Sequence, residues 1–519
     1  MTAVTKNYSF GKTNGSMNVN PLLPPLNKTV YGSITSTEIS SDIAIARENE
    51  NEINATDGVI ASCSTTIVCP IKHPNNKAIA WAMDSASKGP LKMSSTFLMS
   101  ALLVLAKSET TKTSQGEPAI YGIKVSSMLT LASIPVALAA AAFMPLFGAI
   151  VDYTSNRRAV GLGTAVVLVV INGTQSFVSS QNWLFMLGLL VLSNFLYVIH
   201  TTVVLAYLPD LSDDEGKLSG YTALFSIIQI VVQCIYVVIV LITTRVMEGD
   251  TVLTAQISHV VSFIMTTPLL LYSWTNLFQP CPALHVLPPG RSLITAGFTE
   301  LSSTTRKILG PGTPLPCLRL FMLSMLFSPD LGSGNYNSIF ISFETVHLNM
   351  TGGQIGLVSL LALLSTIPGS LLSKYLCTNY GALFSFRMCL IWWFTTMTLS
   401  SLVLKGPDQA HLCYFPFSLL WGVQFGWIFP SQQVLFCTLV PHGKETELMG
   451  IFSFFGQVMG WAPPLLFSGI NELGWGMRLG LVSSNILIAV AFILLTFIDY
   501  NTALQQAKSF NNWNEITRG

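Results

Sequence analysis

Long apolar segments follow one another through most of this 519-residue chain, and the charge between them is scarce. Of the 51 Lys, Arg, Asp and Glu residues, twelve precede residue 79 and three follow residue 499. The remaining 36 charges are spread over 421 residues, too few to coat two or three soluble domains with a polar surface. The sequence therefore predicts a membrane protein with many spans, embedded in a lipid bilayer.

Segments of about 20 apolar residues mark the expected membrane crossings. We count twelve, at residues 79–106, 122–151, 158–179, 183–208, 219–245, 254–275, 317–343, 354–376, 380–404, 411–438, 447–470 and 477–499. A polar, proline-rich stretch divides them six and six and favours a non-helical connector. The predicted fold class is an all-α polytopic membrane protein of two pseudo-symmetric six-helix halves, which resembles the major facilitator fold.

The domain organisation follows from this division. We expect a disordered cytosolic arm over residues 1–77, an N-terminal half over 78–278, a cytosolic connector over 279–316, a C-terminal half over 317–499 and a cytosolic tail over 500–519. Lys and Arg in the loops number ten on the side of the two termini against six on the other, which favours cytosolic termini. The sequons at Asn172 and Asn349 both fall on the opposite, non-cytosolic side.

Several classes of function are excluded by what the sequence lacks. A net charge of +1 leaves no broad basic face for nucleic acid. The nine cysteines are scattered without metal-ligand spacing, so we expect no metal and no cofactor. No nucleophile elbow, P-loop or paired-acid motif is present, which argues against an enzyme and against an ATP-driven pump.

Charged residues within the first span are candidates for substrate binding or ion coupling, because ionisable groups are costly in a membrane. Asp84 and Lys88 are spaced i, i+4 on one helix face. An ion pair with a structural role only is therefore an equal alternative. Gln229 and Gln233, also i, i+4, would line a cavity or hydrogen-bond between helices. The lone histidines of the spans, such as His200, are more often packing residues than proton relays.

The seventh span contains the candidate ligand site. Asp330 follows Pro329, and the polar residues after it, which include Asn335 and Asn337, should unwind the helix near mid-membrane. A broken helix exposes backbone carbonyls and amides to a zwitterionic ligand. The alternative is a loop that joins two shorter apolar segments, which would change the helix count.

The loop after the second span carries a charged motif. Its pattern G-x-x-x-D-x-x-x-x-R-R comprises Gly148, Asp152, Arg157 and Arg158 and resembles the loop between helices 2 and 3 of the major facilitator superfamily. Glycine would permit close helix approach, and the Asp and Arg pair would form a latch at the cytosolic mouth. Ordinary positive-inside arginines beside a helix-ending Asp are the simpler alternative.

Two loops in equivalent places of the two halves share one plan, in which a helix ends, a short charged turn follows, and a new helix starts with small residues. Their residues are Pro209, Asp210, Ser219, Gly220 and Tyr221 in the first half and Gly443, Lys444 and Glu445 in the second. Together with Gly456–Phe467 and Arg478, these loops resemble the vacuole effluxer family, the autophagy-linked amino-acid exporters of the major facilitator superfamily.

The resemblance implies a secondary transporter that moves amino acids from vacuole or lysosome to cytosol by proton-linked alternating access. Met83, Ser85 and Lys88 depart from the family pattern in the region expected to face substrate. A transporter of sugars or other small metabolites therefore stays open as an alternative. A receptor or scaffold that kept the fold without transport is the alternative from another class.

Overall fold

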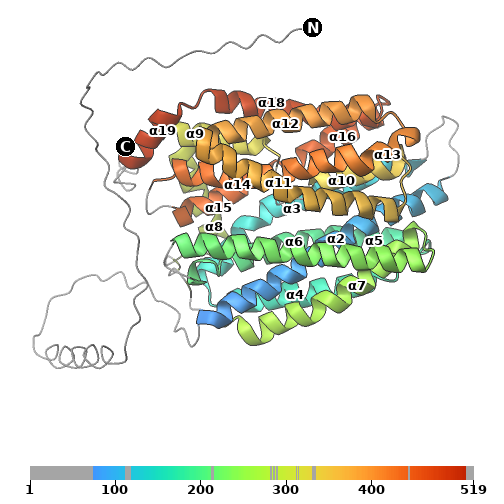
Figure 1. The fold of residues 1–519 in the computed structure, drawn as a ribbon. Coiled ribbons are helices and arrows are strands. Elements are labelled where there is room, and N and C mark those ends of the chain that lie inside the picture. Colours follow the sequence, from blue (N-terminus) through green and yellow to red (C-terminus); the bar gives the residue numbers. More distant parts are fainter. Residues whose placement is uncertain are drawn as a thin grey trace, which may run out of the picture. The chain divides into compact units, whose positions relative to one another are not determined.

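The computed structural model describes residues 74–110, 119–211, 215–280, 292–310, 315–329, 335–441 and 445–509, with single positions 283, 287, 290, 312 and 313. Long helices run side by side through this part of the chain (Figure 1). We call the side where helix α2 begins the N-terminal side, on the left in Figure 1, and the opposite side the far side.

The elements of the N-terminal half and connector are α2 (Pro74–Glu109), β1 (Ala119–Ile120), β2 (Ile123–Lys124), α3 (Val125–Tyr153), α4 (Arg157–Gln175), α5 (Trp183–Leu205), η1 (Pro209–Leu211), α6 (Glu215–Val246), α7 (Thr251–Tyr272), η2 (Ser273–Leu277) and α8 (Leu293–Leu309). Those of the C-terminal half are α9 (Pro316–Phe327), α10 (Asn335–Ser342), η3 (Phe343–His347), α11 (Gly352–Tyr380), α12 (Ala382–Val403), η4 (Pro407–Gln409), α13 (Ala410–Leu412), η5 (Cys413–Phe417), α14 (Ser418–Leu439), α15 (Glu445–Val458), α16 (Ala462–Glu472), α17 (Met477–Ser483), α18 (Asn485–Thr496) and α19 (Tyr500–Ser509). The strands β1 and β2 form an antiparallel hairpin.

The predicted fold class is confirmed. Eleven helical segments among the described residues are long and apolar enough to cross a membrane, and they coincide with eleven of the twelve predicted spans. The predicted seventh span instead contains two shorter helices, α9 and α10, and Asp330 between them lies outside the described residues. Asn335 and Asn337 were expected in an unwound stretch but are helical, because α10 packs Tyr336 and Ile339 into the core.

The connector is not entirely non-helical, which corrects the sequence interpretation. Residues 293–309 form α8, a helix of 17 residues. The prolines of the connector all lie outside this stretch, and the hydroxyl of Ser292 caps the helix by accepting from the backbone N–H of Thr295. The connector as a whole is rich in proline, but it contains a proline-free segment, and that segment forms a helix.

Glycines bring two helices of the C-terminal half into backbone contact. A Cβ atom added at Gly426 of α14 would lie 2.0 Å from the carbonyl oxygen of Thr366 in α11, and one at Gly422 would lie 2.2 Å from that of Ala362. The hydroxyl of Ser370 donates to the Gly426 carbonyl at 3.0 Å. Close approach through small residues is how membrane helices associate without a hydrophobic driving force.

We expect Gly426→Ala to lower stability by about 1–3 kcal/mol, because the added methyl group must separate two backbones. The melting temperature of the purified protein measures this. Gly353→Ala in α11 is the matched control, because nothing lies within 4 Å of a Cβ atom added there. Equal melting temperatures for the two variants would contradict the packing described for α11 and α14.

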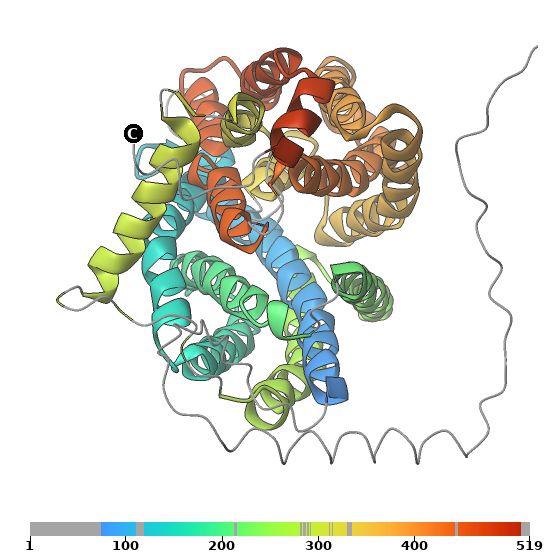
Figure 2. The same cartoon turned by 90° about the vertical axis from the view of Figure 1, so that its left-hand side faces the viewer.

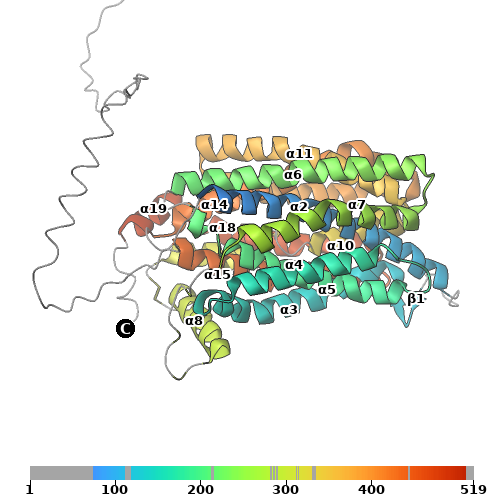
Figure 3. The ribbon, with the colours of Figure 1, turned by 90° about the horizontal axis from the view of Figure 1, so that it is seen from below.

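Hydrogen bonds join the two halves toward the far side. The amide of Asn471 in α16 donates to the hydroxyls of Ser126 and Ser127 in α3, at 2.6 and 2.8 Å. The backbone N–H of Gly352 in α11 donates to the Thr251 hydroxyl of α7 at 3.1 Å. These contacts lie where α3, α7 and α11 begin, at the far ends of the helices (Figure 3).

Candidate functional site

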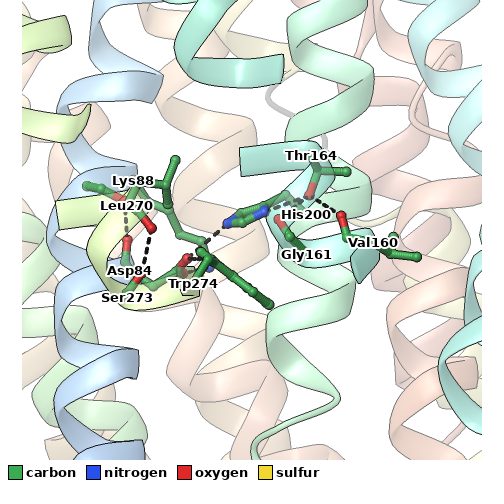
Figure 4. A network of polar contacts seen from close by, with 10 residues as sticks. Asp84, Lys88, Val160, Gly161, Thr164, His200, Leu270, Ser273 and Trp274 are labelled. Carbon is green, nitrogen blue, oxygen red and sulfur yellow. Dashed lines mark hydrogen bonds and ion pairs between the residues drawn. The ribbon is translucent and has the colours of Figure 1, made fainter. Parts of the chain in front are cut away.

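A buried carboxylate lies at the centre of a polar cluster within the N-terminal half (Figure 4). Asp84 of α2 is fully buried. Its Oδ2 is 2.7 Å from Nζ of Lys88, and its Oδ1 is 2.9 Å from Nε2 of His200. The indole Nε1 of Trp274 donates to the same Oδ1 at 3.0 Å. We refer to these four residues as the Asp84 cluster.

Four helical segments position the Asp84 cluster. Lys88 follows Asp84 by one turn of α2, as their spacing predicted. His200 comes from α5, and Trp274 comes from η2 after α7. Gly161 of α4 makes room for the indole, since a Cβ atom there would lie 2.0 Å from the Trp274 ring. A residue without a side chain on α4 is therefore required for Trp274 to reach Asp84.

His200 also contacts a hydroxyl that can act as donor or acceptor. Thr164 Oγ1 lies 2.9 Å from Nδ1 of His200 and within 3.0 Å of the carbonyl oxygens of Val160 and Gly161. With a neutral imidazole, the hydroxyl donates to Nδ1 while Nε2–H donates to Asp84. With a protonated imidazole, Nδ1–H donates to the hydroxyl, which then donates to a backbone carbonyl. The geometry satisfies both protonation states of His200.

The charges of the cluster determine what it can bind. Asp84 and Lys88 offset one another, which a buried pair requires because desolvation of each ion is costly. Protonation of His200 gives the group a net positive charge. The arrangement can therefore hold a proton and would favour an anionic group close by. Lys88 is 8% exposed, whereas the Asp84 side chain is fully buried.

A second buried cluster surrounds Asn172, and it corrects one sequence interpretation. Asn172 is 2% exposed within α4. Its Oδ1 is 2.7 Å from Nδ1 of His259 and accepts from Ser94 at 3.3 Å, while its Nδ2 donates to Ser262 at 3.1 Å. The sequon at Asn172 is thus buried and does not mark an exposed far-side loop. Asn349, the second sequon residue, is exposed after η3.

Three further predicted residues lie around α2. Gln233 of α6 is buried, and its Nε2 lies 3.5 Å from Sδ of Met93. The backbone oxygen of Gln229 would lie 2.8 Å from a Cβ atom at Gly89, so α6 packs closely on α2 there. Asn337 of α10 donates to the Thr96 hydroxyl of α2 at 3.1 Å, across the two halves. The side chain of Asn335 and the whole of Asp330 lie outside the described residues.

The predicted latch residues contact neighbours within the N-terminal half. Arg157 is 1% exposed, donates to the Ala206 carbonyl at 3.0 Å and lies 3.8 Å from the Asp210 carboxylate. Arg158 donates to the carbonyl oxygens of Trp274 and Thr275 at the end of the last helix of this half. These contacts brace the loops of one half and do not connect it to the other.

Gly148 does not have the predicted packing role, because a Cβ atom there would have nothing within 4 Å. Of the paired loop residues, Asp210 also lies 4.0 Å from Lys77, and Tyr221 stacks on Phe225 with ring centroids 6.0 Å apart. The remaining predicted loop and latch positions have side chains or whole residues outside the described part, namely Asp152, Pro209, Ser219, Gly220, Gly443, Lys444 and Glu445.

The described helices have the fold of solved major facilitator transporters. A transporter of the POT family solved in complex with 5-aminolevulinic acid is similar at TM-score 0.56, with 12% identity over 83% of this chain and 97% of that one. The nucleoside transporter NupG is similar at TM-score 0.53, with 14% identity over 82% and 99%. A D-xylose-proton symporter is similar at TM-score 0.51, with 12% identity over 82% and 98%. Likeness at this identity shows the fold alone.

Comparison with protein families identifies the chain more specifically than its fold does. A family model described as "Vacuole effluxer Atg22 like" matches residues 80–223 and 214–508. The chain belongs to this family, which confirms the resemblance inferred from the paired loops. No curated protein matches the chain.

Proposed function

We propose that this transporter exports amino acids from vacuole or lysosome to cytosol by proton-linked alternating access. The family's description as a vacuole effluxer supports the membrane and the direction. The observation that carries the proposal is the Asp84 cluster, where a buried histidine contacts both a carboxylate and a switchable hydroxyl. Buried ionisable groups of this kind mark ion pathways in membrane proteins.

In this scheme His200 takes up a proton on the acidic, lumenal side. Once His200 is protonated, the cluster carries an excess positive charge. The carboxylate of an amino acid would balance that charge. Lys88 is buried, but its side chain is 8% exposed whereas that of Asp84 is fully enclosed, so Lys88 would meet that carboxylate first. Release of the proton to the cytosol removes the excess charge and weakens substrate binding, so proton and substrate would move together.

The contacts between the halves support the alternating-access part of the proposal. With the termini in the cytosol, the far side faces the lumen, and the bonds of Asn471 to Ser126 and Ser127 hold the lumenal end closed. Opening toward the lumen requires these hydrogen bonds to break as the halves rock against one another.

The test is uptake of a labelled neutral amino acid into proteoliposomes under an imposed pH gradient. We expect gradient-dependent uptake that unlabelled amino acids inhibit and sugars do not. Uptake of a sugar instead would show that the protein is a transporter of sugars or other small metabolites. No flux of either solute from well-folded protein would favour a receptor or scaffold.

We expect Thr164→Val to weaken proton coupling while the fold is kept. The valine cannot accept from Nδ1–H, and a hydrogen bond to a charged group contributes about 1.5–3 kcal/mol against about 0.5–1.5 kcal/mol for a neutral one. The protonated form of the cluster therefore loses more than the neutral form. The pH profile of uptake should shift so that half-maximal flux needs a donor side more acidic by about one pH unit.

Thr164→Ser is the matched control because it keeps the hydroxyl group. We expect its pH profile to match that of the wild type. A Val variant with an unchanged profile would remove Thr164 from the coupling scheme.

A further inference from the structure

The connector helix α8 lies on the edge of the bundle at the N-terminal side. Figure 2, viewed from that side, shows α8 lying across the edge at the left while neighbouring spans are seen end-on. Gly297 permits its contact with α3, since a Cβ atom there would lie 2.3 Å from the Pro145 carbonyl oxygen. Ile308 on the inner face is 1% exposed, whereas Ile294 and Phe298 on the outer face are 55% and 44% exposed. An amphipathic helix with this placement is typical of the membrane interface.

A groove runs between α8 and α15. Its volume is about 490 Å³. Its walls are mainly apolar, from Phe298, Leu301 and Leu309 of α8 and Phe454 of α15. Because α15 belongs to the C-terminal half, a molecule in the groove would contact both the connector helix and that half.

Arg306 supplies a positive charge at this groove. Its side chain lines the groove and is exposed to solvent. Among the ion pairs of the described residues, none involves the Arg306 guanidinium. A soluble anion would bind the arginine without needing the apolar walls, and a neutral lipid would fill the walls without needing the arginine. An anionic lipid matches both features.

We propose that this groove binds an anionic phospholipid of the leaflet at the N-terminal side. The acyl chain lies against Leu301, Leu309 and Phe454, and the headgroup phosphate pairs with Arg306. The lipid site is separate from the site of the transported substrate, so it can be tested independently of the proposed transport function.

Native mass spectrometry of the full chain, released from nanodiscs of equimolar phosphatidylserine and phosphatidylcholine, tests this site. We expect the wild type to retain phosphatidylserine in preference to phosphatidylcholine. In Arg306→Gln the preference should fall roughly fivefold, the factor that corresponds to about 1 kcal/mol per basic residue near an anionic surface. Lys374→Gln is the control, since Lys374 is an exposed cation of α11 that does not line the groove.

Leu301→Trp tests the apolar part, because the larger side chain fills the groove. We expect it to reduce retention of both lipids while the protein stays monodisperse. Equal retention of the two lipids by the wild type would overturn the proposal. So would an Arg306→Gln preference that matches that of Lys374→Gln.

Discussion

Asp84→Asn is expected to abolish proton-driven transport and to destabilise the protein by about 3–5 kcal/mol, because it leaves Lys88 as a buried charge without a counterion. The substitution also removes the charged acceptor that His200 and Trp274 share. Proteoliposome flux measures the first effect. The melting temperature measures the second, and it should fall by several degrees.

Two further variants test whether these effects come from the unpaired charge of Lys88 and whether they are specific to Asp84. Asp84→Asn combined with Lys88→Gln removes both ions, so we expect stability to return toward that of the wild type while proton-driven flux stays absent. Asp408→Asn changes an exposed carboxylate on the far side and should alter neither quantity. Proton-driven flux in the single variant at the wild-type rate would show that Asp84 is not part of the coupling site.

Gly161→Ala is expected to have the second-largest effect. The added methyl group would lie 2.0 Å from the Trp274 ring, which is fully buried and cannot swing into solvent. The ring must move off Asp84, at a cost of about 1–3 kcal/mol for overpacking. We expect a lower melting temperature and a flux reduced at least tenfold, measured in the same proteoliposome assay.

Gly163→Ala on the same helix is the matched control, because a Cβ atom there meets nothing within 4 Å. It should leave flux unchanged and add up to about 1 kcal/mol of stability, since alanine is the better helix former. Trp274→Phe in the Gly161→Ala background should relieve the clash without restoring the indole N–H. Full flux in Gly161→Ala itself would contradict the role given to Trp274.

Eleven of the twelve spans were predictable because a membrane crossing requires about 20 consecutive apolar residues. The ion pair of Asp84 and Lys88 was also predictable from local sequence, because the two residues are spaced by one helical turn. His200 and Trp274 are 116 and 190 residues from Asp84 along the chain, and no periodicity in the sequence indicates that their helices meet. The sequence therefore favours a packing role for His200, and its contacts with Asp84 and Thr164 come from the structure.

Glycines illustrate the same limit. Gly148 belongs to a recognisable motif yet faces open space, whereas Gly161 belongs to none and admits the Trp274 ring. Sequence indicates where a glycine occurs but not which side chain approaches it. The helix α8 does not follow from the proline content of the connector, because the prolines all lie outside the 17 residues that form the helix.

The most direct test of proton coupling uses proteoliposomes that contain a pH-sensitive dye and start without a pH gradient. A neutral amino acid is added outside, and the internal pH is followed. We expect the interior to acidify with the wild type, because substrate and proton enter together, and not with His200→Gln. Entry of the amino acid without any change in internal pH would contradict proton-linked transport.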